Sequence, residues 1–130
     1  MRIGVFFSRT GTLDRSFPKT RRLTLTSEFR QVRENGRAQH SKLLILSVLP
    51  TDSDPEIRYG VITSRRVGPA VVRNRVRRRL REIFRLHQSE IQPGHKIVAI
   101  ARPTAATVTF QRLESDWLQL ARRASIVCAR

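Results

Sequence analysis

The chain carries one decisive stretch, Ser64-Arg65-Arg66-Val67-Gly68-Pro69-Ala70-Val71-Val72-Arg73-Asn74-Arg75-Val76-Arg77-Arg78-Arg79-Leu80-Arg81-Glu82, which is rich in arginine and still has apolar residues at helical spacing. At about 100° per residue, the apolar side chains fall within an arc of about 120° of the helix surface; they are Val76, Leu80, Ile83 and Phe84. Pro69 suits the first turn of a helix. The stretch therefore predicts a helix from about Pro69 to His87, with one face packed into a core.

The charge of this segment indicates a polyanionic partner. Residues 65–85 hold nine arginines and one acid, Glu82, and so supply +8 of the formal net charge of +16. Solvated helix faces ordinarily mix both signs, and a net charge this large strains the compact state by self-repulsion. The pattern is typical of a nucleic-acid-binding helix.

The helical spacing divides these arginines into two ridges. One ridge lies beside the apolar arc and consists of Arg73, Arg77 and Arg81. The other lies on the far flank and consists of Arg75, Arg78 and Arg79, with Asn74 and Arg85 between the two ridges. We therefore expect two separate phosphate-binding faces on one helix.

The remaining segments predict an α+β fold. Helices are expected at residues 26–35 and about 110–127, and strands at 37–40, 42–49, 57–63 and 96–101. With the central helix, the order is αβββαβα without an internal repeat, which indicates a sheet covered by helices. The length of 130 residues favours one domain, at 17–130, preceded by a mobile basic arm at 1–16.

Several function classes find no support in the residues. The single cysteine, Cys128, excludes an internal disulfide and a multi-thiolate metal site. Residues 3–7 are too short for a signal peptide, and no segment is long enough to span a bilayer, so a cytoplasmic protein is expected. The carboxylates of Asp52, Asp54 and Glu56 are interpreted as turn residues beside Pro55. His87 with Glu90 is weak support for a metal site.

A resemblance then emerges from the quoted residues. Ser64–Gly68 and Ala70–Arg78 resemble the signature of the protein subunit of bacterial ribonuclease P. The similarity extends over about residues 17–127 and includes Arg22-Leu23, Glu28-Phe29, Val32, Gly36, Arg58-Tyr59-Gly60-Val61 and Ile97–Pro103.

The resemblance implies a ribonucleoprotein enzyme that removes the 5′ leader from precursor tRNA. Its catalytic RNA would perform Mg²⁺-dependent hydrolysis, so this chain would carry no catalytic side chain and bind no cofactor or metal by itself. The partners would be the catalytic RNA, in a complex with one protein monomer, and precursor tRNA, with no membrane. The implied fold is a two-layer sandwich with a four-stranded mixed sheet and a left-handed βαβ crossover.

The resemblance also implies two sets of site residues. The set that docks the catalytic RNA is Arg65, Arg66, Arg73, Asn74, Arg75 and Arg78. The set that forms a leader cleft between the first helix and the sheet is Phe29, Arg33, Ile45, Ser47, Arg77 and Arg81. Arg33 and Ser47 stand where the family usually has aromatic residues, so leader binding is expected to depend more on charge than on stacking. Phe29 is equally well interpreted as a core residue.

Three other functions remain open at this stage. A structural RNA-binding protein of the ribosomal type would have the same charge without assisting cleavage. A DNA-binding module could insert the basic helix in a major groove, where Asn74 would read adenine, although a helix this dense in arginine discriminates bases poorly. An independent protein nuclease would have to cleave RNA without a partner.

Overall fold

The computed structural model describes residues 6–7, 13–14, 23, 26–51, 57–92 and 94–127. Within these ranges the α-helices are α1 (Thr26–Asn35), α2 (Ala70–His87) and α3 (Phe110–Arg123). The strands of the main sheet are β3 (Arg37–His40), β4 (Leu44–Pro50), β5 (Arg58–Thr63) and β6 (His95–Ala101). The 3₁₀ turns are η2 (Arg65–Val67), η3 (Gln88–Glu90) and η4 (Pro103–Thr107), and β1 (Phe6–Phe7) pairs with β2 (Leu13–Asp14).

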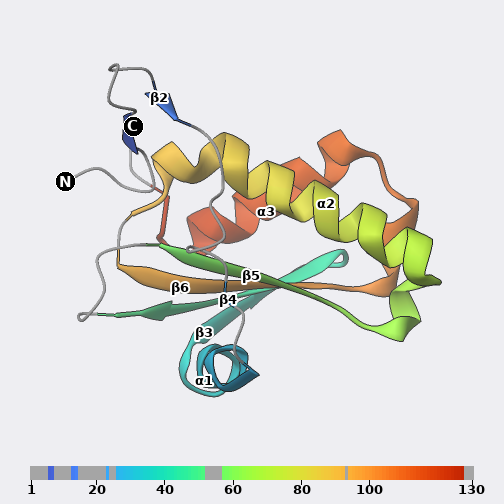
Figure 1. The fold of residues 1–130 in the computed structure, drawn as a ribbon, viewed down its shortest axis with the longest axis horizontal. Coiled ribbons are helices and arrows are strands. Elements are labelled where there is room, and N and C mark those ends of the chain that lie inside the picture. Colours follow the sequence, from blue (N-terminus) through green and yellow to red (C-terminus); the bar gives the residue numbers. More distant parts are fainter. Residues whose placement is uncertain are drawn as a thin grey trace.

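The main sheet is mixed and has the order β3-β4-β6-β5. The pairs β3/β4 and β4/β6 are antiparallel, whereas β5 and β6 are parallel and joined through α2. The predicted α+β fold with the order αβββαβα is confirmed, and the left-handed sense of the β5–α2–β6 connection stays a prediction. Helices α2 and α3 cover one face of the sheet as expected for a sandwich, and α1 adds a layer on the other face (Figure 1).

Side chains alternate between the two faces of the central strand β4. Leu44, Leu46 and Val48 join the large core under α2 and α3. The four apolar residues predicted for the inner face of α2, Val76, Leu80, Ile83 and Phe84, are all fully buried in this core. The predicted helical stripe is therefore confirmed, and its burial fixes which side chains of α2 face outward.

A smaller core lies beneath α1. It is formed by Leu23, Val32 and Val98, with Phe29 packed against it. The Phe29 ring lies directly on the backbone of Gly60 in β5, where an added Cβ would come within 2.5 Å of the ring atom Cε1. Gly60 therefore permits α1 to approach the edge strand of the sheet.

The last helix, α3, ends at Arg123, whereas the sequence predicted an end near Val127. Ser125 adopts a left-handed φ of 60°, and the Ile126 N–H donates to the Ala121 carbonyl at 3.2 Å. This is the bonding of a Schellman motif, which terminates a helix. The chain then turns so that Ile126 is buried and Val127 pairs with Ile91.

Some predictions lie wholly or mostly outside the described residues. These are the turn at 52–55 with its neighbour Glu56, the residue Cys128, and the mobile arm at 1–16 apart from β1 and β2. Among the helices in the described ranges, none has the length and hydropathy that crossing a membrane requires.

Candidate functional site

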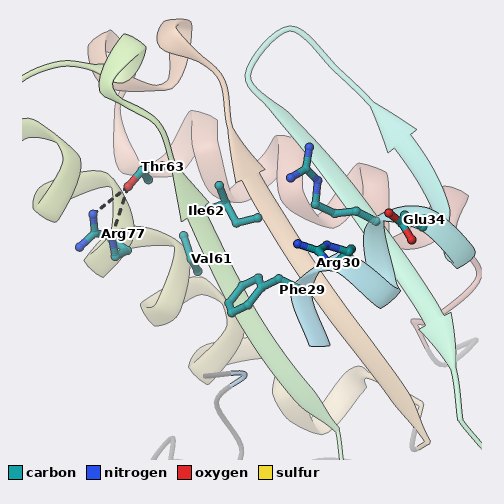
Figure 2. Close-up of a pocket in the computed structure, with 8 residues that line it drawn as sticks. Phe29, Arg30, Glu34, Val61, Ile62, Thr63 and Arg77 are labelled. Atoms are coloured by element: carbon teal, nitrogen blue, oxygen red, sulfur yellow. Dashed lines mark hydrogen bonds between the residues drawn. The ribbon is translucent and has the colours of Figure 1, made fainter. Parts of the chain in front are cut away.

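A hollow of about 720 Å³ lies along the outer edge of β5, between α1 and α2. Eight residues from these three elements line it: Phe29, Arg30, Arg33, Glu34, Val61, Ile62, Thr63 and Arg77. Figure 2 shows Phe29 between the Thr63–Arg77 pair on one side and Arg30 with Glu34 on the other. We call this space the first hollow. It combines an apolar floor with three arginines.

Phe29 has two roles that the sequence left as alternatives. Its ring packs on Gly60 and the small core, and it is also half-buried and lines the first hollow. An aromatic face in such a position can stack on any base. The residue is therefore both a core contact and an accessible part of the surface.

Arg77 is held in place at the border of the first hollow. Its Nε and Nη2 donate to the Thr63 Oγ1 at 3.3 and 2.9 Å, and its Nη1 donates to the Asn74 Oδ1 at 3.0 Å (Figure 2 shows the Thr63 bonds). Thr63 is the last residue of β5, so these bonds tie α2 to the edge strand. The guanidinium group is thereby fixed at the border.

A second hollow, of about 410 Å³, lies on the outward side of α2 and is lined by Val71, Asn74, Arg77, Arg78 and Arg81. Val71 is 75% exposed there, and Arg78 is also exposed. The two spaces share one lining residue, Arg77.

On the opposite flank of α2, two arginines donate hydrogen bonds to backbone carbonyls of the protein. Arg75 Nη2 donates to the Ala106 carbonyl, and Arg79 Nη1 donates to the Val108 carbonyl, both at 2.9 Å. These carbonyls belong to η4 and the residue after it. The predicted ridge of Arg75, Arg78 and Arg79 is therefore wrong as a unit, because Arg78 shares a hollow with Arg77 and Arg81 while the other two are anchored to η4.

The residues before α2 are more open. Arg65 and Arg66, predicted to dock RNA, are exposed on η2. Arg73 donates through Nε to the Gly68 carbonyl at 3.2 Å, across the start of the helix. Gly68 has a φ of 149°, which favours glycine and allows the turn from η2 into α2.

The predicted leader-cleft residues are only partly brought together. Phe29, Arg33 and Arg77 line the first hollow, whereas Arg81 lines the second. Ile45 and Ser47 line neither, and Ser47 is only 3% exposed in β4. Strand alternation turns both side chains toward the sheet face that α1 covers. The inclusion of Ser47 as an accessible cleft residue is therefore wrong.

Five residues of the first hollow escaped the sequence analysis: Arg30, Glu34, Val61, Ile62 and Thr63. Arg30 could have been found from its helical spacing with the predicted residue Arg33, and Glu34 from its spacing with Arg30, because residues three or four apart share a face. The contribution of β5 depends on which strand lies at the sheet edge, and this order is a property of the tertiary structure.

The acid of α2, Glu82, lines neither hollow. Glu82 Oε1 and Oε2 accept bonds from Arg85 at 2.9 and 2.6 Å. This pairing lowers the pKa of the Glu82 carboxyl. No carboxylate is among the five residues that line the second hollow.

The imidazole of His87 lies between two carboxylates. Its Nδ1 lies 3.0 Å from the Glu90 carboxylate and its Nε2 lies 2.7 Å from that of Glu114. Burial lowers the pKa of His87, but the hydrogen bonds to both carboxylates outweigh it and raise the pKa overall. In the described part of the chain, no group of three or more His, Cys, Asp and Glu residues is arranged to hold a metal ion.

Comparison with known proteins agrees with this architecture. A sequence model of the family Ribonuclease P matches residues 17–125. The chain belongs to the ribonuclease P protein family. The ribonuclease P protein component of Clostridioides difficile is 38% identical over 85% of this chain and 96% of its own length. That of Chloroflexus aggregans is 39% identical over 84% of this chain and 81% of its own.

Solved structures of the family share the fold. The ribonuclease P protein of Staphylococcus aureus superposes with a TM-score of 0.78 at 24% identity, over 84% of this chain and 99% of that chain. The protein from Thermotoga maritima superposes with a TM-score of 0.71 at 28% identity, over 78% of this chain and 96% of that chain. The four-stranded mixed sheet with three helices is therefore the architecture of the ribonuclease P protein.

Proposed function

We propose that this chain is the protein subunit of a ribonucleoprotein ribonuclease P that binds both the catalytic RNA and the 5′ leader of precursor tRNA. The observation that carries the proposal is the first hollow, where an accessible aromatic ring and a fixed arginine lie on either side of the edge strand β5. Stacking on Phe29 suits leaders of different sequence, since every base has a π-face.

The exposed arginines from η2 into α2 bind the catalytic RNA in this proposal. Arg65, Arg66 and Arg78 are exposed and lie along one continuous stretch from η2 into α2. Phosphate contacts of this kind position a protein on RNA without reading its sequence. One protein chain binds one catalytic RNA, in the cytoplasm, as the family resemblance implies.

The chemistry belongs to the RNA in this proposal. Hydrolysis of the phosphodiester uses Mg²⁺ held by the catalytic RNA, and the protein contributes binding and orientation. Neither hollow combines a nucleophile with a neighbouring base among its lining residues. Effective positioning of a substrate by itself accounts for large rate gains.

The experiment that tests the function is cleavage of precursor tRNA by the cognate catalytic RNA at low Mg²⁺, with and without this protein. The expected result is restored cleavage together with tighter binding of precursor than of mature tRNA. Tight RNA binding without restored cleavage would instead assign a structural RNA-binding protein. Cleavage by the protein alone would contradict the division of roles.

A further inference from the structure

The side chain of Thr63 is the acceptor that fixes Arg77. Its Oγ1 receives two of the guanidinium N–H groups, one from Nε and one from Nη2. The two residues are 14 positions apart, and one ends the edge strand while the other lies in the middle of α2. Thr63 is β-branched, which limits its χ1 rotamers, so the hydroxyl is itself a fixed acceptor.

The hydrogen bonds leave Arg77 with a defined remaining capacity. A guanidinium has five N–H groups. Within the described part of the chain, Thr63 takes two of them and Asn74 takes a third, from Nη1. One N–H remains on each Nη atom, and each can donate a charge-assisted hydrogen bond to a phosphate oxygen.

Arg78 provides a contrast on the same helix. It is exposed in the second hollow and has no hydrogen bond or ion pair within the described residues. A free arginine loses rotamer freedom when it binds a phosphate, whereas a side chain already held in position loses less. Arg77 is therefore preorganised and Arg78 is not.

We propose that Thr63 is a positioning residue, whose hydroxyl holds Arg77, which lines both hollows, ready to bind one backbone phosphate of the precursor leader. The inference rests on the proposed function, because it takes the leader as the strand in the first hollow. It adds that leader affinity depends on a side chain that need not contact the RNA.

The test uses the holoenzyme with Thr63→Val, which keeps the shape and removes the acceptor, and with Thr63→Ser, which keeps the acceptor. Dissociation constants are measured for precursor and mature tRNA. Thr63→Val is expected to weaken precursor binding about three- to tenfold, as for loss of one well-placed hydrogen-bond acceptor, with mature tRNA unchanged. Thr63→Ser is expected to restore most of the affinity.

A double variant separates positioning from general disruption. In an Arg77→Ala background, Thr63→Val is expected to have no further effect on precursor binding, because there is no guanidinium left to hold. Unchanged precursor binding in Thr63→Val, or an undiminished effect in the Arg77→Ala background, would overturn the inference. If Arg77→Ala itself bound precursor like wild type, the leader-binding role of Arg77 would fail instead.

Discussion

The two flanks of α2 carry the same residue type and use it differently. On the flank facing the hollows, Arg77, Arg78 and Arg81 line accessible space. On the other flank, Arg75 and Arg79 donate to backbone carbonyls at the η4 segment. The difference shows that an arginine's role on a basic helix depends on which acceptors the tertiary structure brings to it. The proposed RNA contacts belong to the first flank, and helix anchoring belongs to the second.

The largest effect is expected when both Arg77 and Arg81 are replaced by alanine. Each loses a charge-assisted hydrogen bond to phosphate, so precursor affinity of the holoenzyme should fall about 100-fold, with a much smaller change for mature tRNA. Parallel titrations with precursor and mature tRNA measure the ratio of the two affinities. An equal loss for both tRNAs would remove the leader role of this flank.

Replacement of Arg79 by alanine tests the anchoring flank. Loss of its bond to the Val108 carbonyl should reduce the free energy of unfolding by about 1 to 2 kcal/mol and lower Tm by roughly 5 °C. The ratio of precursor to mature affinity should stay unchanged. The matched control is Arg78→Ala on the exposed side, which should alter stability by less than about 0.5 kcal/mol. If Arg78→Ala lowered the free energy of unfolding more than Arg79→Ala, the assignment of anchoring to the Arg79 flank would be wrong.

Salt dependence distinguishes the flanks in a third way. If about six phosphates are neutralised, log K for RNA binding should fall against log salt with a slope near −5. Arg78→Ala should make this slope shallower by about 0.9, whereas Arg79→Ala should leave it unaltered because its guanidinium is engaged with the protein. Equal slopes for the two variants would show that the flanks bind RNA alike.

The smallest effect concerns the end of α2, where His87 joins Glu90 and Glu114. Because the folded pKa of His87 is raised, its ion pairs stabilise the protein fully below the unfolded pKa and are lost as the pH rises through the folded pKa. Denaturant unfolding of wild type and His87→Gln should therefore differ by about 1 kcal/mol near pH 5.5 and by less above pH 8. A gap that widens with pH would contradict this assignment.

The sequence predicted those features that depend on local periodicity. The buried face of α2 follows from the spacing of Val76, Leu80 and Ile83, and the structure buries all three. The division into ridges failed at Arg78, because a helical projection contains no information about the carbonyls of η4. Thr63 was missed for a similar reason, since its acceptor role exists only when β5 lies beside α2.

Two further differences have local causes that sequence patterns conceal. The α3 helix stops early through a left-handed serine at position 125, a place where glycine is the usual signal. Ser47 was placed in the cleft by family resemblance, but α1 covers its sheet face and leaves it almost fully buried. Both outcomes depend on how neighbouring elements pack.

The central claim, that the precursor leader lies in the first hollow, is tested most directly by site-specific crosslinking. A photoreactive group is attached to a cysteine at position 30, which lines the first hollow, or at position 112, which is exposed on α3, with Cys128 replaced by serine in both proteins. In the holoenzyme bound to precursor tRNA, the account predicts crosslinks from position 30 to leader nucleotides and none from position 112. Crosslinks from position 30 confined to the catalytic RNA or to the mature tRNA body would contradict it.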